Sequence, residues 1–344
     1  MSFIKIAVIF GGASPEYSVS LQSAHAIMTH LDHNRYELLP IGITKQGEWY
    51  YYTGHLDHLL DDTWHQNDQE LRSVMISFAS NHRGFMLDNH QHLDVDLVFP
   101  VLHGENGEDG TVQGMIKLTG LPVVGCGVLS SALCMDKERA HKLVSLEGIR
   151  VPRSVTFKKH QTLSVNDLSY PLFVKPVHAG SSFGITKIMK HEELKEAAEK
   201  AFQYDDEIII EEAIEGFEVG CAILGCDELI TGRVDEIELS QGFFDFTEKY
   251  TLKSSKIHMP ARIDQDTEKR IQETAKTIYK ALDCSGFARV DMFYTPEGDI
   301  VFNEVNTIPG FTSHSRYPNM MKGAGLSFEQ IIDTLIGLYS HYAS

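Results

Sequence analysis

The sequence is short of basic residues: 30 lysines and arginines stand against 48 aspartates and glutamates in 344 residues, a formal net charge of −18 at pH 7. This charge disfavours a nucleic-acid partner, although it leaves room for a local cationic site. Long apolar runs are also lacking. The apolar stretch Ile4 to Phe10 passes directly into Gly11-Gly12 without a cleavage-type region, which predicts a buried first strand and no membrane partner.

Cysteine is scarce. The five cysteines are odd in number and show no paired metal-ligand spacing, so we expect reduced thiols in the core of a cytoplasmic protein. The histidines His55, His58 and His65 have no accompanying cysteine, and we interpret them as scattered surface residues. With 42% hydrophobic and 10% aromatic residues, the chain is an ordinary globular protein that is long enough for two or three domains.

Two apolar-alternating runs between Ala288 and Asn306 predict a β-hairpin, because a Pro-Glu-Gly-Asp turn at 296–299 joins them. This turn predicts the facing pairs Phe293 and Phe302, Asp291 and Glu304, and Arg289 and Asn306. Facing carboxylates are unfavourable, and a divalent cation would reverse that penalty. The hard oxygens of Asp291, Glu304 and Asn306 suit magnesium, which usually also carries phosphate when it has few protein ligands. The alternative is a solvated acidic hairpin with Arg289 as the counter-charge.

A strand, a glycine loop and a helix open the chain and form a βα unit over residues 5–31. Its loop can approach an anion or a carboxylate at the helix N-terminus. A dinucleotide fold is disfavoured, because Gly-Gly-x-Ser-x-Glu16 lacks the spaced third glycine and carries an acid inside the loop. A second buried strand over 96–103 ends in another glycine-rich loop, which makes His103 and Glu108 site candidates.

Lys175 ends a predicted strand and precedes a glycine- and serine-rich loop at 178–184. A point charge beside backbone amides suits phosphate binding. The P-loop class is excluded, because the lysine precedes the loop instead of closing it. Lys137 is a second candidate cation, and a strand over 207–212 leads to Glu218, a candidate for contact with a nucleoside.

Seven ordered motifs resemble those of the D-alanine:D-alanine ligases, which are ATP-grasp enzymes. They are Gly11-Gly12-x-Ser-x-Glu16, His103-Gly-x-x-Gly-Glu108-Asp109-Gly, Met135-Asp136-Lys137, Lys175-Pro-x-x-x-Gly-Ser181-Ser182-x-Gly, Arg289-x-Asp291, Glu304-x-Asn306 and Pro309-Gly310-x-Thr-Ser313. The resemblance covers essentially the whole chain. It implies an α/β fold with an N-terminal Rossmann-like parallel-sheet domain (1–125), a central ATP-grasp domain (126–215) and a C-terminal ATP-grasp domain (216–344), the last two clasping ATP. It also implies a homodimer.

The resemblance further implies that ATP phosphorylates the carboxylate of a first D-alanine and that the amine of a second amino acid attacks the acyl phosphate. Two magnesium ions, or manganese in their place, would lie at Asp291, Glu304 and Asn306. By the same resemblance, the phosphates would be held by Lys137, Lys175 and Lys249, the nucleoside would be held by Glu211 and Glu218, and adenine would be flanked by Phe293 and Phe302, which otherwise pack in the core. The first ammonium would be bound by Glu16, the substrates would be contacted by His103 and Ser315, and a hydrogen-bonded clasp would be formed by Ser181, Tyr250 and Glu16. The oxyanion would be stabilised by Arg289 and the Gly310 amide.

The second substrate depends on a few positions. Lys249-Tyr250 matches dipeptide-forming members, whereas lactate-using members carry a histidine-bearing lid that this chain lacks. Arg316, with Asp235 and Phe244, resembles the pocket of VanG-type D-alanine:D-serine ligases of vancomycin resistance, and a pocket that hydrogen-bonds a hydroxyl can distinguish D-serine from D-alanine. D-Serine is therefore the expected second substrate, and D-alanine is the alternative. In the alternative, Arg316 only pairs with a surface carboxylate. A non-catalytic nucleotide-binding regulator is disfavoured, because Tyr250, Ser181 and Arg289 are all present.

Overall fold

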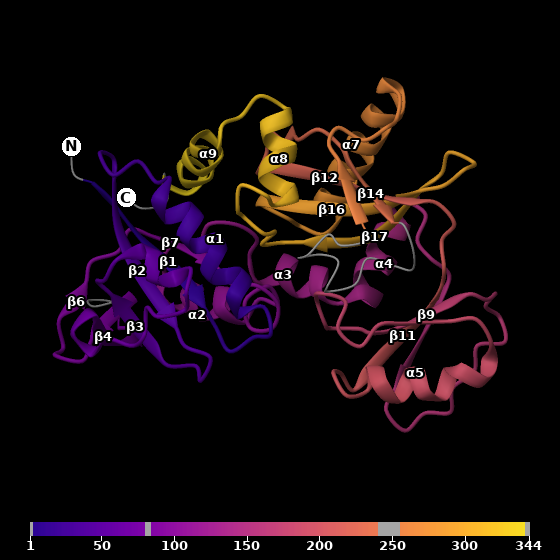
Figure 1. The fold of residues 1–344 in the computed structure, drawn as a ribbon, viewed down its shortest axis with the longest axis horizontal. Coiled ribbons are helices and arrows are strands. Elements are labelled where there is room, and N and C mark those ends of the chain that lie inside the picture. The colour runs from indigo at the N-terminus through magenta and orange to yellow at the C-terminus, as the bar shows by residue number, and fades with distance from the viewer. Residues whose placement is uncertain (1–2, 80–83, 240–254, 341–344) are drawn as a thin grey trace.

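The computed structural model describes residues 3–79, 84–239 and 255–340, which contain three separate β-sheets (Figure 1). The first sheet lies at one end of the molecule, and the second and third lie together at the other. Within the described residues, no helix is both long and apolar enough to cross a lipid bilayer.

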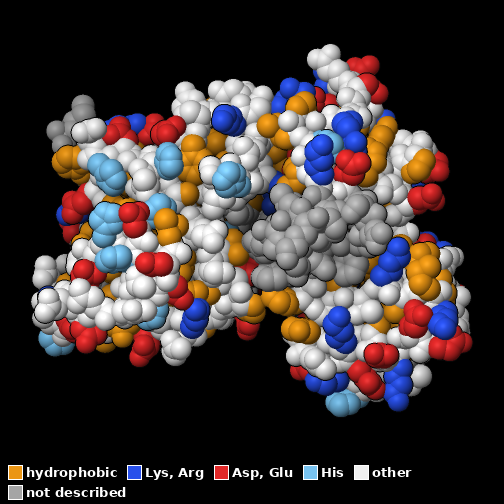
Figure 2. Space-filling model, in the orientation of Figure 1, with side chains coloured by type: hydrophobic (Ala, Val, Ile, Leu, Met, Phe, Trp, Pro, Cys, Tyr) orange, Lys and Arg blue, Asp and Glu red, His pale blue; other side chains and the backbone are white. Residues whose placement is uncertain are grey.

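The first sheet has the order β6-β5-β4-β3-β2-β1-β7. Its centre is parallel, as predicted, because β1 pairs in parallel with both β2 and β7. The strands β3 to β6 extend it through antiparallel pairs. The elements of this part are β1 (Ile4–Gly11), α1 (Tyr17–Thr29), β2 (Tyr36–Ile43), β3 (Trp49–Tyr52), β4 (Leu71–Ser77), β5 (Gly84–Leu87), β6 (His92–Leu93), β7 (Leu97–Val101), α2 (Thr111–Thr119) and short 3-10 turns at Leu56–Leu59 and Asp68–Glu70. Figure 2 shows histidines scattered over this end of the molecule.

The second sheet is antiparallel, with the order β10-β9-β11-β8. Its elements are β8 (Ser154–Lys158), β9 (Leu172–Pro176), β10 (Thr186–Ile188), a 3-10 turn at His191–Glu193, α5 (Leu194–Ala201) and β11 (Glu207–Glu212). The alanine-rich face of α5 packs on buried residues of β9 and β11. The opposite face of this sheet is therefore available to the site.

The third sheet has the order β15-β14-β12-β16-β17, with β13 beside β12. Its elements are β12 (Phe217–Gly225), β13 (Ile230–Thr231), β14 (Asp235–Leu239), β15 (Ser255–His258), α7 (Gln265–Ala281), β16 (Gly286–Tyr294), β17 (Ile300–Asn306), α8 (Arg316–Gly323) and α9 (Phe328–Ser340). The helix α7 packs on one face through Ile271, Ala275 and Ile278.

Two helical segments pack outside the ranges predicted for their domains. The helices α3 (Val128–Met135) and α4 (Lys137–Leu146) share the core of α7 and the third sheet, through residues such as Cys134 and Val144. The helix α9 instead shares a core with the first sheet. Each of the three sheets falls inside one predicted range, and the domain limits themselves stay a prediction.

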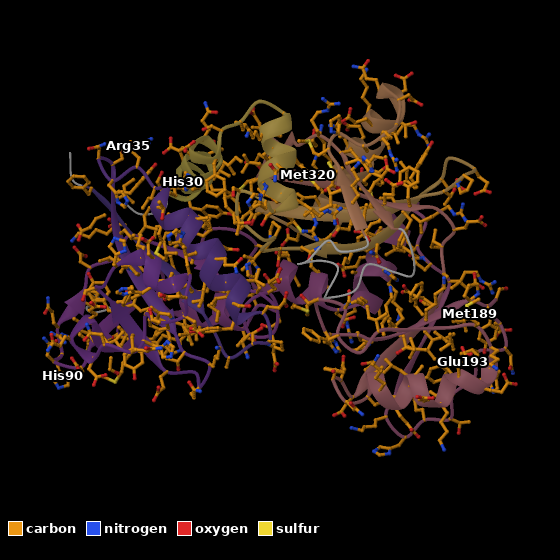
Figure 3. All side chains as sticks on the ribbon, in the orientation of Figure 1. His30, Arg35, His90, Met189, Glu193 and Met320 are labelled. Carbon is orange, nitrogen blue, oxygen red and sulfur yellow. The ribbon has the colours of Figure 1, made fainter. Side chains whose placement is uncertain are left out.

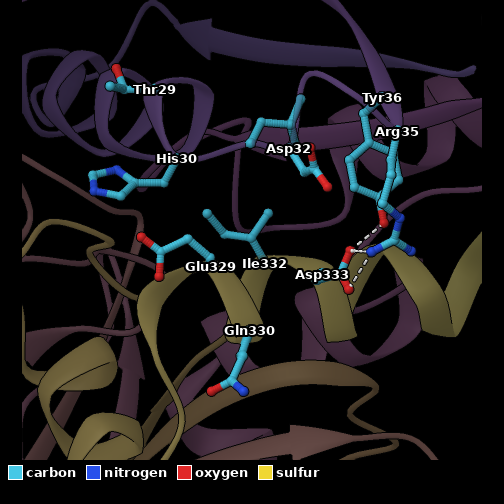
Figure 4. A pocket seen from close by; sticks show the side chains of 10 residues that line it. Thr29, His30, Asp32, Arg35, Tyr36, Glu329, Gln330, Ile332 and Asp333 are labelled. Atoms are coloured by element: carbon cyan, nitrogen blue, oxygen red, sulfur yellow. Dashed lines mark hydrogen bonds and ion pairs between the residues drawn. The ribbon is translucent and has the colours of Figure 1, made fainter.

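The first part and α9 are also joined by polar contacts. Arg35 donates to both oxygens of Asp333 at 2.6 Å, and the Tyr36 hydroxyl donates to the same carboxylate at 2.5 Å (Figure 4). Figure 3 shows His30 and Arg35 at this edge, where the ring centroids of His30 and Phe328 lie 4.7 Å apart. These contacts fix the first part against the C-terminal segment.

The predicted hairpin is β16 and β17. The pairs Arg289–Asn306 and Asp291–Glu304 are confirmed, but the pair Phe293–Phe302 is wrong. A bulge after Asp291 shifts the register, so that Phe302 faces Met292. Phe302 is fully buried beside His141 in the core of α7, and only Phe293 of the two phenylalanines lines the site cavity.

The cysteines are free thiols in the structure. Four of them are buried, and Cys226 is partly exposed. The prediction of unpaired core cysteines is confirmed for those four.

Candidate active site

A cavity of about 540 Å³ lies between the second and third sheets, a size typical of small-molecule sites. Five predicted ATP contacts line it: Lys137, Lys175, Glu211, Glu218 and Phe293. They come from α4, β9, β11, β12 and β16, so the fold brings together residues that are far apart in the sequence. Lys249, Tyr250 and Phe244 lie outside the described residues.

The two lysines line this cavity, and each has a partner there. Lys175 forms an ion pair with Glu211 Oε1, and both side chains are nearly buried. Glu211 Oε2 is buried and has no hydrogen-bond partner among the described residues. Lys137 Nζ donates to the Ala179 carbonyl at 2.7 Å. An unmatched buried acceptor is costly, and a donor group of a ligand in this cavity would satisfy it.

The glycine- and serine-rich loop of the second part contacts the first part of the molecule. Ser181 and Ser182 both have left-handed backbone conformations, with φ of 50° and 61°, which are uncommon for residues other than glycine. Ser181 Oγ donates to the carboxylate of Glu16. Two of the three residues predicted for the clasp are therefore in contact.

His178, at the start of this loop, is held by two aspartates. Its Nδ1 lies 2.9 Å from Asp205 and its Nε2 lies 3.2 Å from Asp136. Hydrogen bonds to Asp136 and then Asp205 raise the pKa of His178 to about 9, which favours a charged imidazolium at neutral pH. The imidazolium ties the loop to the helix start that carries Lys137.

A narrow pocket lies where the three parts meet, and it connects Glu16, Glu108, Ser181 and Asn306. Glu108 accepts from the backbone N–H groups of Gly104 at 3.0 Å and Ile308 at 2.9 Å. Burial, and then the nearby charge of Glu16, raise the pKa of Glu108 to about 8. A buried carboxyl group with a raised pKa in a pocket is typical of functional sites.

His103 braces the loop that carries Gly310. It is 4% exposed, with Nδ1 2.8 Å from the Ile308 carbonyl and Nε2 3.1 Å from Ser23 Oγ. Burial lowers its pKa, so the neutral imidazole donates from Nδ1. Ser23 in turn accepts from the Phe311 N–H at 3.1 Å. The structure therefore places His103 against this loop, and its predicted contact with substrate stays a prediction.

The loop leads into the N-terminus of α8. Ser315 immediately precedes that helix, and its Oγ accepts from the Thr312 N–H at 3.0 Å. A Cβ on Gly310 would lie 3.1 Å from the same oxygen, so the two predicted site residues are neighbours. A helix N-terminus favours a carboxylate, which is the group that Ser315 is predicted to meet.

The hairpin carboxylates face different surroundings. Asp291 is buried and accepts from Arg289 Nη2 at 2.7 Å and from the Asn306 amide at 3.0 Å. Glu304 lines both the narrow pocket and the larger cavity. Arg289 is thus the counter-charge of Asp291, as in the alternative interpretation, but the pair is buried instead of solvated.

The residues fit the predicted divalent cation by their donor chemistry. Among the described residues, no cluster of three or more histidine, cysteine, aspartate or glutamate side chains is arranged to hold a metal. The predicted set is instead two carboxylates and one amide, which are hard oxygen donors that suit magnesium with phosphate completing its shell. Glu304 faces the cavity that holds Lys137, which is where that phosphate would lie.

Arg316 is the centre of a buried charge network. Its Nε and Nη2 donate to the two oxygens of Asp235, each at 2.8 Å. Its Nη1 donates to Glu218 at 3.0 Å and lies 3.3 Å from Asp291. The side chain is only 7% exposed, so the alternative in which Arg316 forms a surface salt bridge is wrong.

Gly220 makes this network possible, and its role was not predicted from the sequence. It lies between Asp235 and Asp291 in one row across β14, β12 and β16. A Cβ at this position would lie 2.3 Å from Arg316 Nη2 and 2.7 Å from Asp235 Oδ1. A glycine inside an otherwise apolar strand is the available signal, because it often marks the close approach of another group.

Comparison with known proteins agrees with this geometry. Sequence models of the D-ala D-ala ligase N-terminus and C-terminus match residues 5–126 and 143–337. The chain belongs to the D-alanine:D-alanine ligase family. It is accordingly an ATP-dependent ligase with the ATP-grasp fold.

The relatives of this ligase include both D-alanine–D-alanine ligases and vancomycin resistance proteins. A D-alanine–D-alanine ligase of Caldicellulosiruptor bescii is 44% identical, over 98% of this chain and 95% of that protein. The vancomycin C-type resistance protein VanC1 of Enterococcus gallinarum is also 44% identical, over 97% of this chain and 98% of its own. The crystal structure of the VanG D-Ala:D-Ser ligase from Enterococcus faecalis is 64% identical with a TM-score of 0.92, over 98% of this chain and all of that one.

Proposed function

We propose that this ligase joins D-alanine to D-serine, with release of ADP and phosphate, to make altered peptidoglycan precursors in vancomycin resistance. The observation that carries the proposal is the buried Arg316 at the start of α8, held by Asp235 at the start of β14. The similarity to the VanG ligase supports it. Formation of D-alanyl-D-alanine for ordinary cell-wall synthesis is the second candidate, because a D-alanine–D-alanine ligase is 44% identical to this chain.

The proposed reaction has two steps, phosphoryl transfer and then formation of the amide bond. A carboxylate oxygen of the first D-alanine attacks the terminal phosphorus of ATP, and the bond to ADP breaks. The amine nitrogen of the second amino acid then attacks the acyl carbon, loses a proton, and expels inorganic phosphate. The residues of the site act by holding these groups in line and by stabilising charge that develops during transfer.

Each step has residues suited to it. Lys137 and Lys175 offset phosphate charge, and the carboxylate of Glu16 holds the first ammonium. Magnesium held by Asp291, Glu304 and Asn306 would neutralise charge on the phosphates when bound. Arg289 and the Gly310 amide would stabilise the oxyanion that forms when the amine adds to the acyl carbon. A homodimer, expected from the family, completes the proposal.

A hydroxyl is recognised when buried polar groups are arranged to hydrogen-bond to it. Such a site rejects the analogue that lacks the hydroxyl, because its own polar groups are then left unpaired. Arg316 and Asp235 are polar groups of this kind, and they are already ordered before substrate arrives. They already bond to each other, and the hydroxyl of D-serine would add a hydrogen-bond partner that the methyl group of D-alanine cannot provide.

Product analysis tests the proposal directly. The enzyme is given ATP, magnesium, D-alanine and D-serine, the two amino acids at equal concentration and near neutral pH. We expect D-alanyl-D-serine to predominate, and Arg316→Leu to shift the products toward D-alanyl-D-alanine. Arg150→Leu, which removes an exposed ion pair with Asp299, is the matched control and should leave the product ratio unchanged. Predominant D-alanyl-D-alanine from the unmodified enzyme would reject D-serine and select the second candidate.

A further inference from the structure

Glu218 belongs to two environments at once. It lies on β12 next to Phe293 of β16 in the sheet register, and both residues line the cavity between the second and third sheets. Its Oε1 also accepts a hydrogen bond from Arg316 Nη1 at 3.0 Å. One carboxylate therefore contacts both the nucleotide cavity and the arginine proposed to select the second amino acid.

Glu218 is placed so that it determines where one edge of the guanidinium lies. The other edge of Arg316, formed by Nε and Nη2, is fixed by the two oxygens of Asp235. Nη1 is shared between Glu218 at 3.0 Å and Asp291 at 3.3 Å. Without the charge of Glu218, the attraction of Asp291 would be unopposed and would draw Nη1 toward the hairpin.

The burial of this network strengthens the influence of the Glu218 charge on the position of Arg316. The side chains of Arg316, Asp291 and Glu218 are 7%, 1% and 14% exposed. Charge interactions at such sites are poorly screened by solvent, and close charged pairs couple strongly in double-mutant cycles. A change in the position of one member is therefore transmitted to the others.

We infer that Glu218 is a positioning residue for second-substrate selection, and that through its bond to Arg316 it couples nucleotide binding to the choice of D-serine. The part about D-serine rests on the proposed function. A nucleotide that engages the Glu218 carboxylate holds it in place, and the carboxylate in turn holds Nη1. Because coupling between two binding sites is reciprocal, the state of Arg316 must also affect nucleotide affinity.

A double-mutant cycle tests the selection role. The readout is the kcat/KM for D-serine divided by the kcat/KM for D-alanine as second substrate, measured for the full-length enzyme. Glu218→Gln should lower this ratio about tenfold in the unmodified enzyme and change it less than about twofold in the Arg316→Leu background. The KM for ATP should rise in both backgrounds, because a nucleotide contact is lost in both. A ratio that does not change, or that changes equally in both backgrounds, would overturn the inference.

Glu218→Asp provides a second variant if Glu218→Gln folds poorly. It keeps the negative charge but withdraws it by one methylene from Arg316. The ratio should then fall less than in Glu218→Gln, and a larger fall would contradict a role through charge. Thermal unfolding of each variant without ligands identifies any variant that is not folded.

A binding measurement separates this inference from the proposed function, because it involves no amino acid. Calorimetric titration with ADP and magnesium gives the Kd of each variant. Arg316→Leu should weaken ADP binding about fivefold when Glu218 is present and should have no further effect in Glu218→Gln. An unchanged or tighter Kd in Arg316→Leu would overturn the coupling. If the unmodified enzyme prefers D-alanine while this binding effect is found, only the D-serine assignment fails.

Discussion

Arg316 and Asp235 form a buried bidentate ion pair across 81 positions of the sequence, with both donor–acceptor distances at 2.8 Å. Such fork-to-fork pairs are directional, so they fix the plane of the guanidinium as well as its position. In this ligase that plane lies against the third sheet where Gly220 leaves room for it. Under the proposed function, the preference for D-serine would therefore depend on Gly220 as well as on the two charged residues.

Gly220→Ala should disturb the ion pair without changing any charge. The added methyl group would overlap Arg316 Nη2 and Asp235 Oδ1, so we expect a loss of about 1–3 kcal/mol in the free energy of unfolding. The preference for D-serine over D-alanine should fall as well. Gly337→Ala in α9 adds the same group where nothing lies within 4 Å, and it should leave the product ratio unchanged. Chemical denaturation and product analysis measure the two effects, and an unchanged ratio in Gly220→Ala would contradict the packing argument.

Glu304→Gln and Asp291→Asn should both depress magnesium-dependent turnover strongly, by about 10-fold to 100-fold or more. The two variants should differ in their free energy of unfolding. Asp291 neutralises two buried arginines, so its replacement should cost about 3–5 kcal/mol in the free energy of unfolding, whereas Glu304 faces the cavity. Turnover across a magnesium titration and unfolding without magnesium provide the two measurements. Unchanged turnover in both variants would reject the proposed metal site.

His178 should stabilise the protein in a pH-dependent manner. Its pKa is raised in the folded state to about 9 from 6.5, so its contribution is complete below about pH 6.5 and is lost as the pH rises through 9. The difference in unfolding free energy between the unmodified enzyme and His178→Gln should therefore shrink over that interval. His191→Gln, an exposed histidine in the same part of the chain, is the control. A difference that stays constant from pH 6 to pH 10 would show that His178 does not act as a cation between the aspartates.

Glu108 should make stability fall with rising pH in the same direction as His178, over a lower pH interval. Its pKa is raised in the folded state to about 8 from 4.5, so the folded protein retains a proton that the unfolded chain releases. Stability should then fall as the pH rises from about 4.5 to about 8. Glu108→Gln should make the unfolding free energy less dependent on pH in this interval, as measured by denaturant titration. Equal pH dependence in both proteins would show that Glu108 is ionised throughout.

Local sequence patterns were enough for much of the hairpin. The turn at 296–299 and the apolar alternation predicted the pairs Arg289–Asn306 and Asp291–Glu304, because both signals act between near neighbours in the chain. They failed at Phe302, which the bulge places opposite Met292 and beside His141 of α4. That packing partner lies in a distant part of the sequence, so the hairpin residues carry no signal for it.

The packing between domains also depends on partners that lie far apart in the sequence. The ranges implied by the family resemblance each contain one sheet. The attachment of α9 to the first part could not be predicted from periodicity, because an amphipathic helix specifies a buried face but not the surface that covers it.

The sequence by itself determined the reaction class, because ordered motifs carry the lysines, carboxylates and glycine loops that ATP-dependent ligation requires. Only the tertiary structure decided that Arg316 is buried and which carboxylates it pairs with. Its partners at positions 218, 235 and 291 come from three strands, and they converge only when β14, β12 and β16 pair and α8 packs above Gly220. The strength of a charge interaction depends on distance and burial, and both are set by that packing instead of by local sequence.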